Sequence, residues 1–186
     1  MRLYESNDSI LAGAELAPIL NSVTVTVGDA LKLSHASNYG GADAADAITD
    51  RIYSICVGIS DESGISLVNL TATTDYDGTY TNALSGDTYV AAADNVTDKK
   101  IQAQMIPIGN HIIEATLSDG SGTAQERGTT TGSDQIGYYL SVDTSDSTML
   151  DETSASTSSE QFIIVKNHPI DSTKVLVKAV EMQRYN

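Results

Sequence analysis

Tryptophan is absent from the 186-residue sequence, and phenylalanine and cysteine each occur once. The single cysteine, Cys56, cannot form an intrachain disulfide, which excludes a small secreted scaffold held by disulfides. Cys56 lies in the apolar run IYSICVGI, residues 52–59. Reactive thiols need an electropositive, partly exposed setting, so we expect this thiol to be buried and inert.

Basic residues are scarce: 10 Lys and Arg stand against 25 Asp and Glu, a net charge of -15. The acids are spread along the whole chain, and such a field repels the phosphates of nucleic acids. No window approaches the roughly 20 apolar residues that span a bilayer, and the first 20 residues do not resemble a signal peptide. We therefore expect a soluble protein that has neither nucleic acid nor membrane as a partner.

Motifs of catalysis and metal binding are also missing. The histidines His35, His111 and His168 lie in or beside predicted turns, and none has a second ligand at a zinc-site spacing. No GxSxG elbow and no glycine-rich phosphate loop occurs. The acidic pairs Asp61–Glu62 and Asp151–Glu152 lie in turn-like segments, where we expect solvated carboxylates. We therefore expect no catalytic residue, no cofactor and no metal, and a protein that is not an enzyme.

Alternating apolar and polar residues dominate what is present. Residues 22–34, SVTVTVGDALKLS, alternate on both sides of Gly28–Asp29, and residues 100–117, KIQAQMIPIGNHIIEATL, alternate on both sides of Gly109–Asn110. Each pattern predicts a β-hairpin with a tight central turn. The expected core positions of the first hairpin are Val23, Val25, Val27, Leu31 and Leu33.

Further strands are expected over residues 51–60, 64–70, 135–142, 160–166 and 172–182, with one short strand near 88–92. Residues 42–50 are alanine-rich and could form two helical turns, whereas residues 118–134 and 143–160 read as long polar loops. We therefore expect an all-β sandwich or barrel of about nine to ten short strands, with long polar loops and at most one short helix. Residues 1–20 are expected to form an N-terminal arm, and residues 21–186 a single β domain, possibly with two small sheets at about 21–100 and 101–186.

Three motifs follow one another in residues 22–70. VTVTVGDALKLS carries Gly28, Asp29, Leu31 and Leu33, then IYSICVGISDESG carries Val57–Ile59 and Gly64, and ISLVNL completes the series. This order resembles the head decoration (cement, or capsid-stabilising) proteins of tailed bacteriophages. In that family a hairpin with a Gly-Asp turn is followed by a strand ending in glycine, a turn and a further strand.

The resemblance implies a non-enzymatic virion protein that binds the outside of an icosahedral capsid and stabilises it, often as a homotrimer. Such proteins use an N-terminal arm or strand to pair with the capsid or with neighbouring subunits. The resemblance therefore implies the major capsid protein and further copies of this chain as partners, and a location on the capsid surface after synthesis in the host cytoplasm. The partner-binding residues that it implies are Arg2, Leu3, Tyr4, Ile10 and Leu11.

Other functions share parts of this pattern. A tail-tube or other phage virion component would have the same β content and acidity, because a negative lumen lets DNA slide past. A carbohydrate-binding or adhesin-like β module would present aromatic side chains to sugars, and the chain has nine tyrosines for that purpose. A major capsid protein needs a long spine helix that the sequence does not predict.

Overall fold

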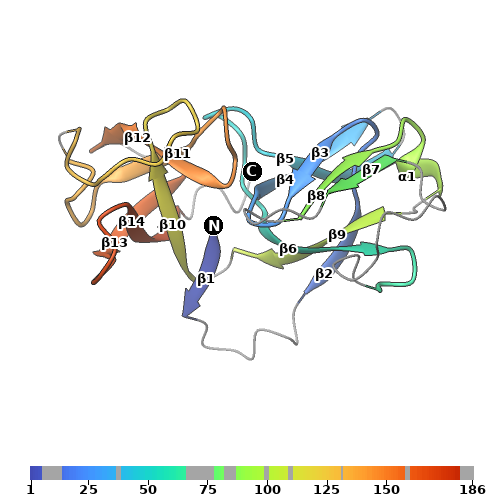
Figure 1. Ribbon diagram of the computed structural model, residues 1–186, viewed down its shortest axis with the longest axis horizontal. Helices are drawn as coiled ribbons and strands as arrows, with labels where there is room; N and C mark the ends of the chain where they lie inside the picture. Colours follow the sequence, from blue (N-terminus) through green and yellow to red (C-terminus); the bar gives the residue numbers. More distant parts are fainter. Residues whose placement is uncertain are drawn as a thin grey trace.

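The computed structural model describes residues 1–5, 14–36, 39–65, 78–81, 87–98, 101–108, 111–130, 132–157 and 160–180. These residues form two β lobes that lie side by side (Figure 1). The first lobe contains β2 (Glu15–Pro18), β3 (Thr24–Thr26), β4 (Ala30–Ala36), β5 (Tyr39–Ala44), β6 (Ser54–Asp61), β7 (Gly78–Thr81), β8 (Thr88–Ala91), β9 (Ile101–Pro107) and the one-turn helix α1 (Asn95–Asp98). The second contains β1 (Arg2–Glu5), β10 (Ile112–Ser118), β11 (Tyr139–Val142), β12 (Met149–Ser156), β13 (Phe162–Asn167) and β14 (Lys174–Ala179). The expected all-β class with at most one short helix is confirmed.

The second lobe is a closed five-stranded barrel. Its strand order β10-β12-β11-β13-β14 returns to β10, because β10 pairs with both β12 and β14. An odd number of strands cannot alternate in direction all the way round, so one neighbouring pair must be parallel. That pair is β10–β12, and the other four are antiparallel. The barrel is filled by Ile113, Ala115, Leu117, Leu140, Val142, Leu150, Phe162, Ile164, Val175 and Val177.

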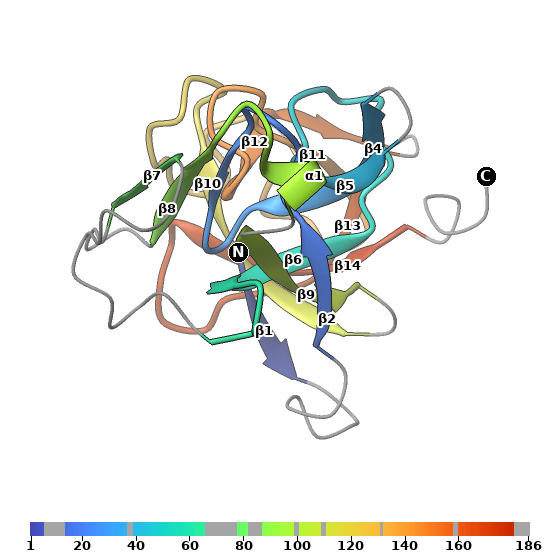
Figure 2. The ribbon, with the colours of Figure 1, turned by 90° about the vertical axis from the view of Figure 1, so that its right-hand side faces the viewer.

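The first lobe is also curled round a core of its own (Figure 2). Its five-stranded antiparallel sheet has the order β2-β9-β6-β4-β5. The two end strands meet where Ile19 bridges Ala42 and the Leu20 N–H donates to the Ala42 carbonyl over 3.0 Å. The three-stranded sheet β3-β8-β7 contributes Val25 and Tyr89 to the same core, which also contains Cys56 at 1% exposure. The expected burial of the thiol is confirmed.

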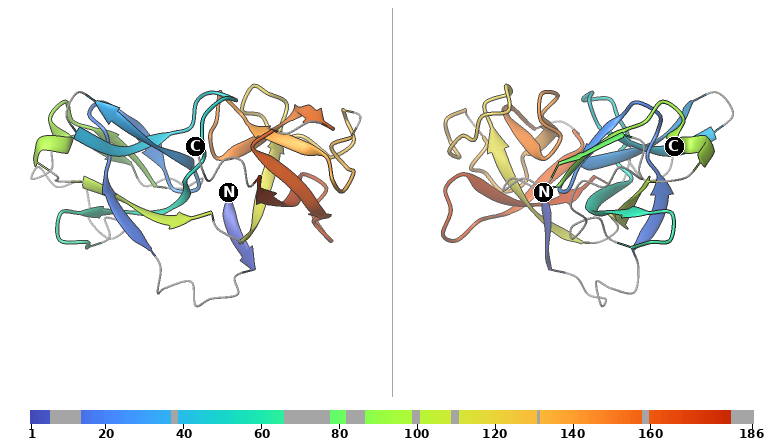
Figure 3. Two further views of the ribbon diagram at one scale, coloured as in Figure 1. Left: turned by 180° about the vertical axis from the view of Figure 1, so that it is seen from behind. Right: turned by 45° about the vertical axis from the view of Figure 1, so that its right-hand side comes forward.

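The two cores are joined at the contact between the lobes. Five residues of the first lobe pack with the interior of the barrel: Ala30, Ala45, Ile52, Ile55 and Ile108. Buried Gln161 adds polar contacts, since its Nε2 donates to the carbonyls of Ala47 and Asp50 and its Oε1 accepts the Val142 N–H. The lobes therefore share one apolar core, and the left panel of Figure 3 shows them from behind.

The predicted hairpin at residues 22–34 is wrong. β3 pairs with β8, whereas β4 pairs with β5 and β6, so the two halves of the pattern belong to different sheets. The chain changes sheet at Gly28, whose φ is +106°, and at Asp29, whose Oδ2 accepts the Thr26 N–H over 2.6 Å. Val25 and Leu31 are core residues as expected, but Leu33 is 52% exposed.

The second predicted hairpin is wrong for the same reason. β9 pairs with β2 and β6 in the first lobe, and β10 belongs to the barrel. The turn expected at Gly109 and Asn110 lies outside the described residues. Most of the strand expected at 64–70 also lies outside them. An alternating pattern predicts which face of a strand is buried, but it does not predict which strand pairs with it.

Residues 42–50 do not form the predicted helical turns, because β5 extends to Ala44. The backbone of β5 lies close to the end of β2 at Gly41. A Cβ at that position would stand 2.5 Å from the Pro18 carbonyl oxygen. Small residues let β5 lie against the end of β2, and a helix of two turns has little stability of its own. Tertiary packing therefore decides the conformation here.

Aspartates and hydroxyl side chains fix the polar loops. In six Asp-x-Ser/Thr triplets the carboxylate accepts the backbone N–H two residues later, and in four of these it also accepts the hydroxyl proton. The aspartates are Asp61, Asp119, Asp143, Asp146, Asp151 and Asp171. These turns order the long polar segments from within, and the segment expected as a loop at 143–160 contains the barrel strand β12.

Two carboxylates expected to be solvated are buried instead. Asp61 is 8% exposed, and Glu152 on β12 is fully buried. Glu152 accepts hydrogen bonds from the Thr130 N–H, from Ser133 Oγ at 2.5 Å and from Gln125 Nε2 at 3.3 Å. Burial raises the pKa of Glu152, but the hydrogen bonds from Ser133 and Thr130 outweigh it and hold the pKa below its ordinary value.

Barrel packing predicts a matched pair of isoleucine variants. Ile164→Ala, inside the barrel, should lower the free energy of unfolding by about 3 kcal/mol, because it removes buried contacts and leaves a cavity. Ile170→Ala, at a residue that is 91% exposed, should change it by less than about 0.5 kcal/mol. Urea denaturation measures both, and equal effects would contradict the barrel core.

The Glu152 network predicts a difference between two replacements. Glu152→Gln keeps an oxygen acceptor for Thr130 and Ser133, whereas Glu152→Ala leaves buried donors unpaired and should cost about 3 kcal/mol. Because the folded pKa of Glu152 lies below the unfolded value, its ionisation stabilises the fold above pH 4.5 and this contribution is lost as the pH falls further. Acid denaturation should show a shallower loss of stability for Glu152→Gln than for wild type, and parallel curves would refute this role.

Candidate functional site

β1 lies where the two lobes meet and is an edge strand. It pairs antiparallel with β10 through Arg2↔Glu114, Leu3↔Ile113 and Glu5↔Ile112. Since β14 occupies the opposite edge of β10 over Ile113–Thr116, β1 and β12 must share one edge, β1 along its first part and β12 along its last. Within the described residues, nothing pairs with the outer edge of β1.

The other described strands differ in how far their edges are paired. The barrel has no open edge, and the end strands of the five-stranded sheet meet at Ile19 and Ala42. Among the described strands, the outer edges of β1, of β2 and β5 away from that bridge, and of the three-stranded sheet have no strand neighbour. Such an edge is a template for a strand from another chain.

The residues expected to bind a partner fall partly on this strand. Arg2, Leu3 and Tyr4 belong to β1, and Ile10 and Leu11 lie outside the described residues. The stretch expected as an arm, residues 1–20, contains β1 and β2 in its described part, and each pairs within the chain's own sheets. Figure 3 shows β1 running from the lobe contact toward the exterior.

The start of β1 is fixed between the lobes. The Met1 ammonium donates to the carbonyl of Gly28 over 2.8 Å and to that of Thr148 over 2.9 Å. Burial lowers the pKa of this amine to about 6. Gly28 needs its freedom here, because a Cβ would stand 3.2 Å from the Met1 nitrogen at a φ that disfavours side chains.

An ionic cluster lies beside β1 on the barrel. Glu114, directly opposite Arg2 in the β1–β10 ladder, is 4% exposed and lies 3.1 Å from Lys174 Nζ and 3.3 Å from His168 Nε2. His168 Nδ1 accepts the Asp171 N–H over 3.0 Å, so in the neutral ring the proton is on Nε2, facing Glu114. Each oxygen of this buried carboxylate therefore faces a basic side chain, and the cluster lies on the strand that β1 pairs with.

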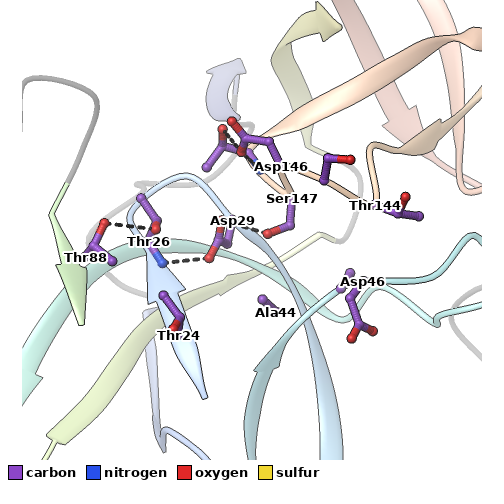
Figure 4. Close-up of a pocket in the computed structure, with 12 residues that line it drawn as sticks. Thr24, Thr26, Asp29, Ala44, Asp46, Thr88, Thr144, Asp146 and Ser147 are labelled. Carbon is purple, nitrogen blue, oxygen red and sulfur yellow. Dashed lines mark hydrogen bonds between the residues drawn. The ribbon is translucent and has the colours of Figure 1, made fainter. Parts of the chain in front are cut away.

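A pocket of about 390 Å³ opens at the lobe contact (Figure 4). β3, β8 and the end of β5 form its walls on the first lobe, and residues 144–148 form the wall on the second. Asp29 links the two sides: its Oδ2 accepts the Thr26 N–H, and its Oδ1 accepts the Ser147 hydroxyl over 2.9 Å. Burial raises the pKa of Asp29 to about 6, against the opposing effect of the Thr26 N–H.

Sequence reasoning missed this pocket. It placed Asp29 in a hairpin turn and residues 143–160 in a polar loop. The triplet Asp146-Ser147-Thr148 is a signal of a fixed turn, because such turns recur through the chain. Nothing in the sequence indicated that this turn would face Asp29, because 118 positions separate Ser147 from Asp29.

Comparison with family models, curated proteins and solved structures found nothing that matches this chain. Across the described ranges, no three His, Cys, Asp or Glu side chains come together as a metal site would require. The same part of the chain has no helix long and apolar enough to cross a membrane.

Asp29 predicts a pH dependence of stability. Its folded pKa, about 6, lies above the ordinary 3.8, so protonation stabilises the fold, and this contribution is lost as the pH rises through about 6. Relative to Asp29→Asn, wild type should lose about 3 kcal/mol of unfolding free energy from a pH well below 3.8 to a pH well above 6. Denaturant titrations at several pH values measure this difference.

Asp94→Asn is the matched control, since it removes the same charge at an exposed turn. It should keep the wild-type slope over this pH range. A similar slope for Asp29→Asn would show that Asp29 does not carry the pH dependence.

Proposed function

We propose that this protein is a non-enzymatic structural protein of a virion, which binds the outside of an icosahedral phage capsid and stabilises it. The observation that carries the proposal is the outer edge of β1, which no strand of the described residues pairs with and which lies at the contact of the two lobes. The partner is the major capsid protein, and the protein acts as a homotrimer on the capsid surface.

Strand addition explains how such an edge attaches to a shell. An incoming capsid strand would gain backbone hydrogen bonds along β1 without needing a deep pocket. The closed barrel and the shared core keep this edge in one orientation, so little conformational entropy is lost on binding. The Glu114 cluster supports β1 from the neighbouring strand.

Multiple contacts make modest affinity sufficient. A shell repeats each site many times, and a trimer that engages three sites at once gains effective concentration for the second and third contact. The net charge of -15 keeps free copies soluble and separate from nucleic acid.

A proline scan of β1 tests the proposal. Successive N–H groups of a strand point to opposite edges, so Arg2→Pro and Leu3→Pro each remove a donor from a different edge. One variant should lose a bond to β10 and stability, and the other should stay fully stable and lose at least about tenfold in affinity for capsids stripped of this protein. Co-sedimentation measures binding and chemical denaturation measures stability.

Arg2→Ala and Leu3→Ala are the matched controls for the side chains. Wild-type protein should saturate the stripped capsids, with bound copies in multiples of three at each site. The proposal fails if wild type does not bind, and the role of the β1 edge fails if the proline variant that stays stable binds as wild type does.

A further inference from the structure

The side chains that line the pocket between the lobes have no role in the proposed binding of β1 to a capsid. Seven of the pocket's twelve lining residues carry a hydroxyl group, three are aspartates and two are alanines. The hydroxyl groups come from both lobes, including Thr24, Thr26 and Thr88 on one side and Thr144 and Ser147 on the other (Figure 4). A ligand in this pocket would therefore touch both lobes.

The walls are held by hydrogen bonds before any ligand arrives. Thr26 Oγ1 and Thr88 Oγ1 lie 3.0 Å apart, and the Ser147 hydroxyl donates to Asp29. Thr148 donates its backbone N–H and its hydroxyl to Asp146 Oδ1, over 2.9 and 2.6 Å. Preformed walls lose little entropy on binding, which is typical of small-molecule sites.

The aspartates are committed to the protein's own groups. Asp29 and Asp146 accept the bonds just described, and Asp46 Oδ1 lies 2.6 Å from Lys32 Nζ. Their charge disfavours phosphate and carboxylate ligands. The hydroxyl groups of Ser147 and Thr148 donate to these aspartates, and each oxygen can still accept a hydrogen bond from a ligand. A hydroxyl both donates and accepts, so a dense set of hydroxyls suits a ligand that does the same.

Ala44 and Ala45 add two methyl groups to this polar lining. A sugar ring carries hydroxyl groups round its rim and C–H groups on its faces, so it can use both kinds of surface. We propose that the pocket between the lobes binds a small polyhydroxylated molecule, such as one monosaccharide unit of a glycan. This site is independent of the β1 edge, so either proposal can fail without the other.

The test is a titration of the full chain with the methyl glycosides of glucose, galactose, mannose and N-acetylglucosamine, followed by backbone amide NMR. At least one glycoside should give saturable shifts confined to residues 24–29, 44–46, 88 and 144–148. The same glycoside should raise the melting temperature, because a ligand that bridges the lobes stabilises their contact.

Two substitutions locate the site. Ala44→Leu fills the pocket and Thr144→Val removes a hydroxyl at constant shape; each should weaken binding of that glycoside by at least about tenfold. Ala93→Leu and Thr49→Val make the same changes at exposed residues outside the pocket and should bind as wild type does.

Three results would overturn the proposal. One is the absence of saturable shifts with every glycoside, and another is shifts that map to other residues or survive Ala44→Leu. The third is saturable shifts at the pocket with lysine or arginine methyl ester but with no glycoside, which would assign the pocket to a cationic ligand instead.

Discussion

The apolar contact between the lobes is the constraint on which the rest of the structure depends. Ala30, Ala45, Ile52, Ile55 and Ile108 complete the core of a barrel to which they do not belong. Because this core crosses from one lobe to the other, the lobes cannot move apart without exposing it to water. The position of β1, the pairing of Asp29 with Ser147 and the walls of the pocket all follow from that contact.

Acidity in this chain has two separate physical roles. Asp61, Asp143 and Glu152 are buried and accept hydrogen bonds from N–H and O–H groups of the loops. These bonds hold polar segments that have few apolar contacts to fix them. The other acids add to the net charge of -15, and charge of one sign favours repulsion between copies of the chain. The serine- and threonine-rich composition belongs to the first role, since hydroxyl side chains two residues after an aspartate close its turns.

The fold class could be predicted from the sequence because alternation is local: Val25 and Leu31 are buried where the pattern placed them. Strand partners could not be predicted, because pairing β3 with β8 instead of β4 depends on the backbone at Gly28 and on the Asp29 side chain. The candidate site was beyond local patterns for a further reason. β1 is positioned by pairing with β10, which lies more than a hundred residues away in the sequence. The pocket is lined by residues from both lobes.

The edge strand β1 at the contact of the two lobes is the feature on which the proposed attachment to a capsid rests. In the proposed function, the two lobes would give the edge a constant orientation, and the shell would supply the repetition that makes a short strand contact sufficient. The most direct measurement is an electron cryomicroscopy map of stripped capsids saturated with the protein. The account predicts an added capsid strand along the outer edge of β1, and a map in which that edge faces solvent or in which no protein is bound would contradict it.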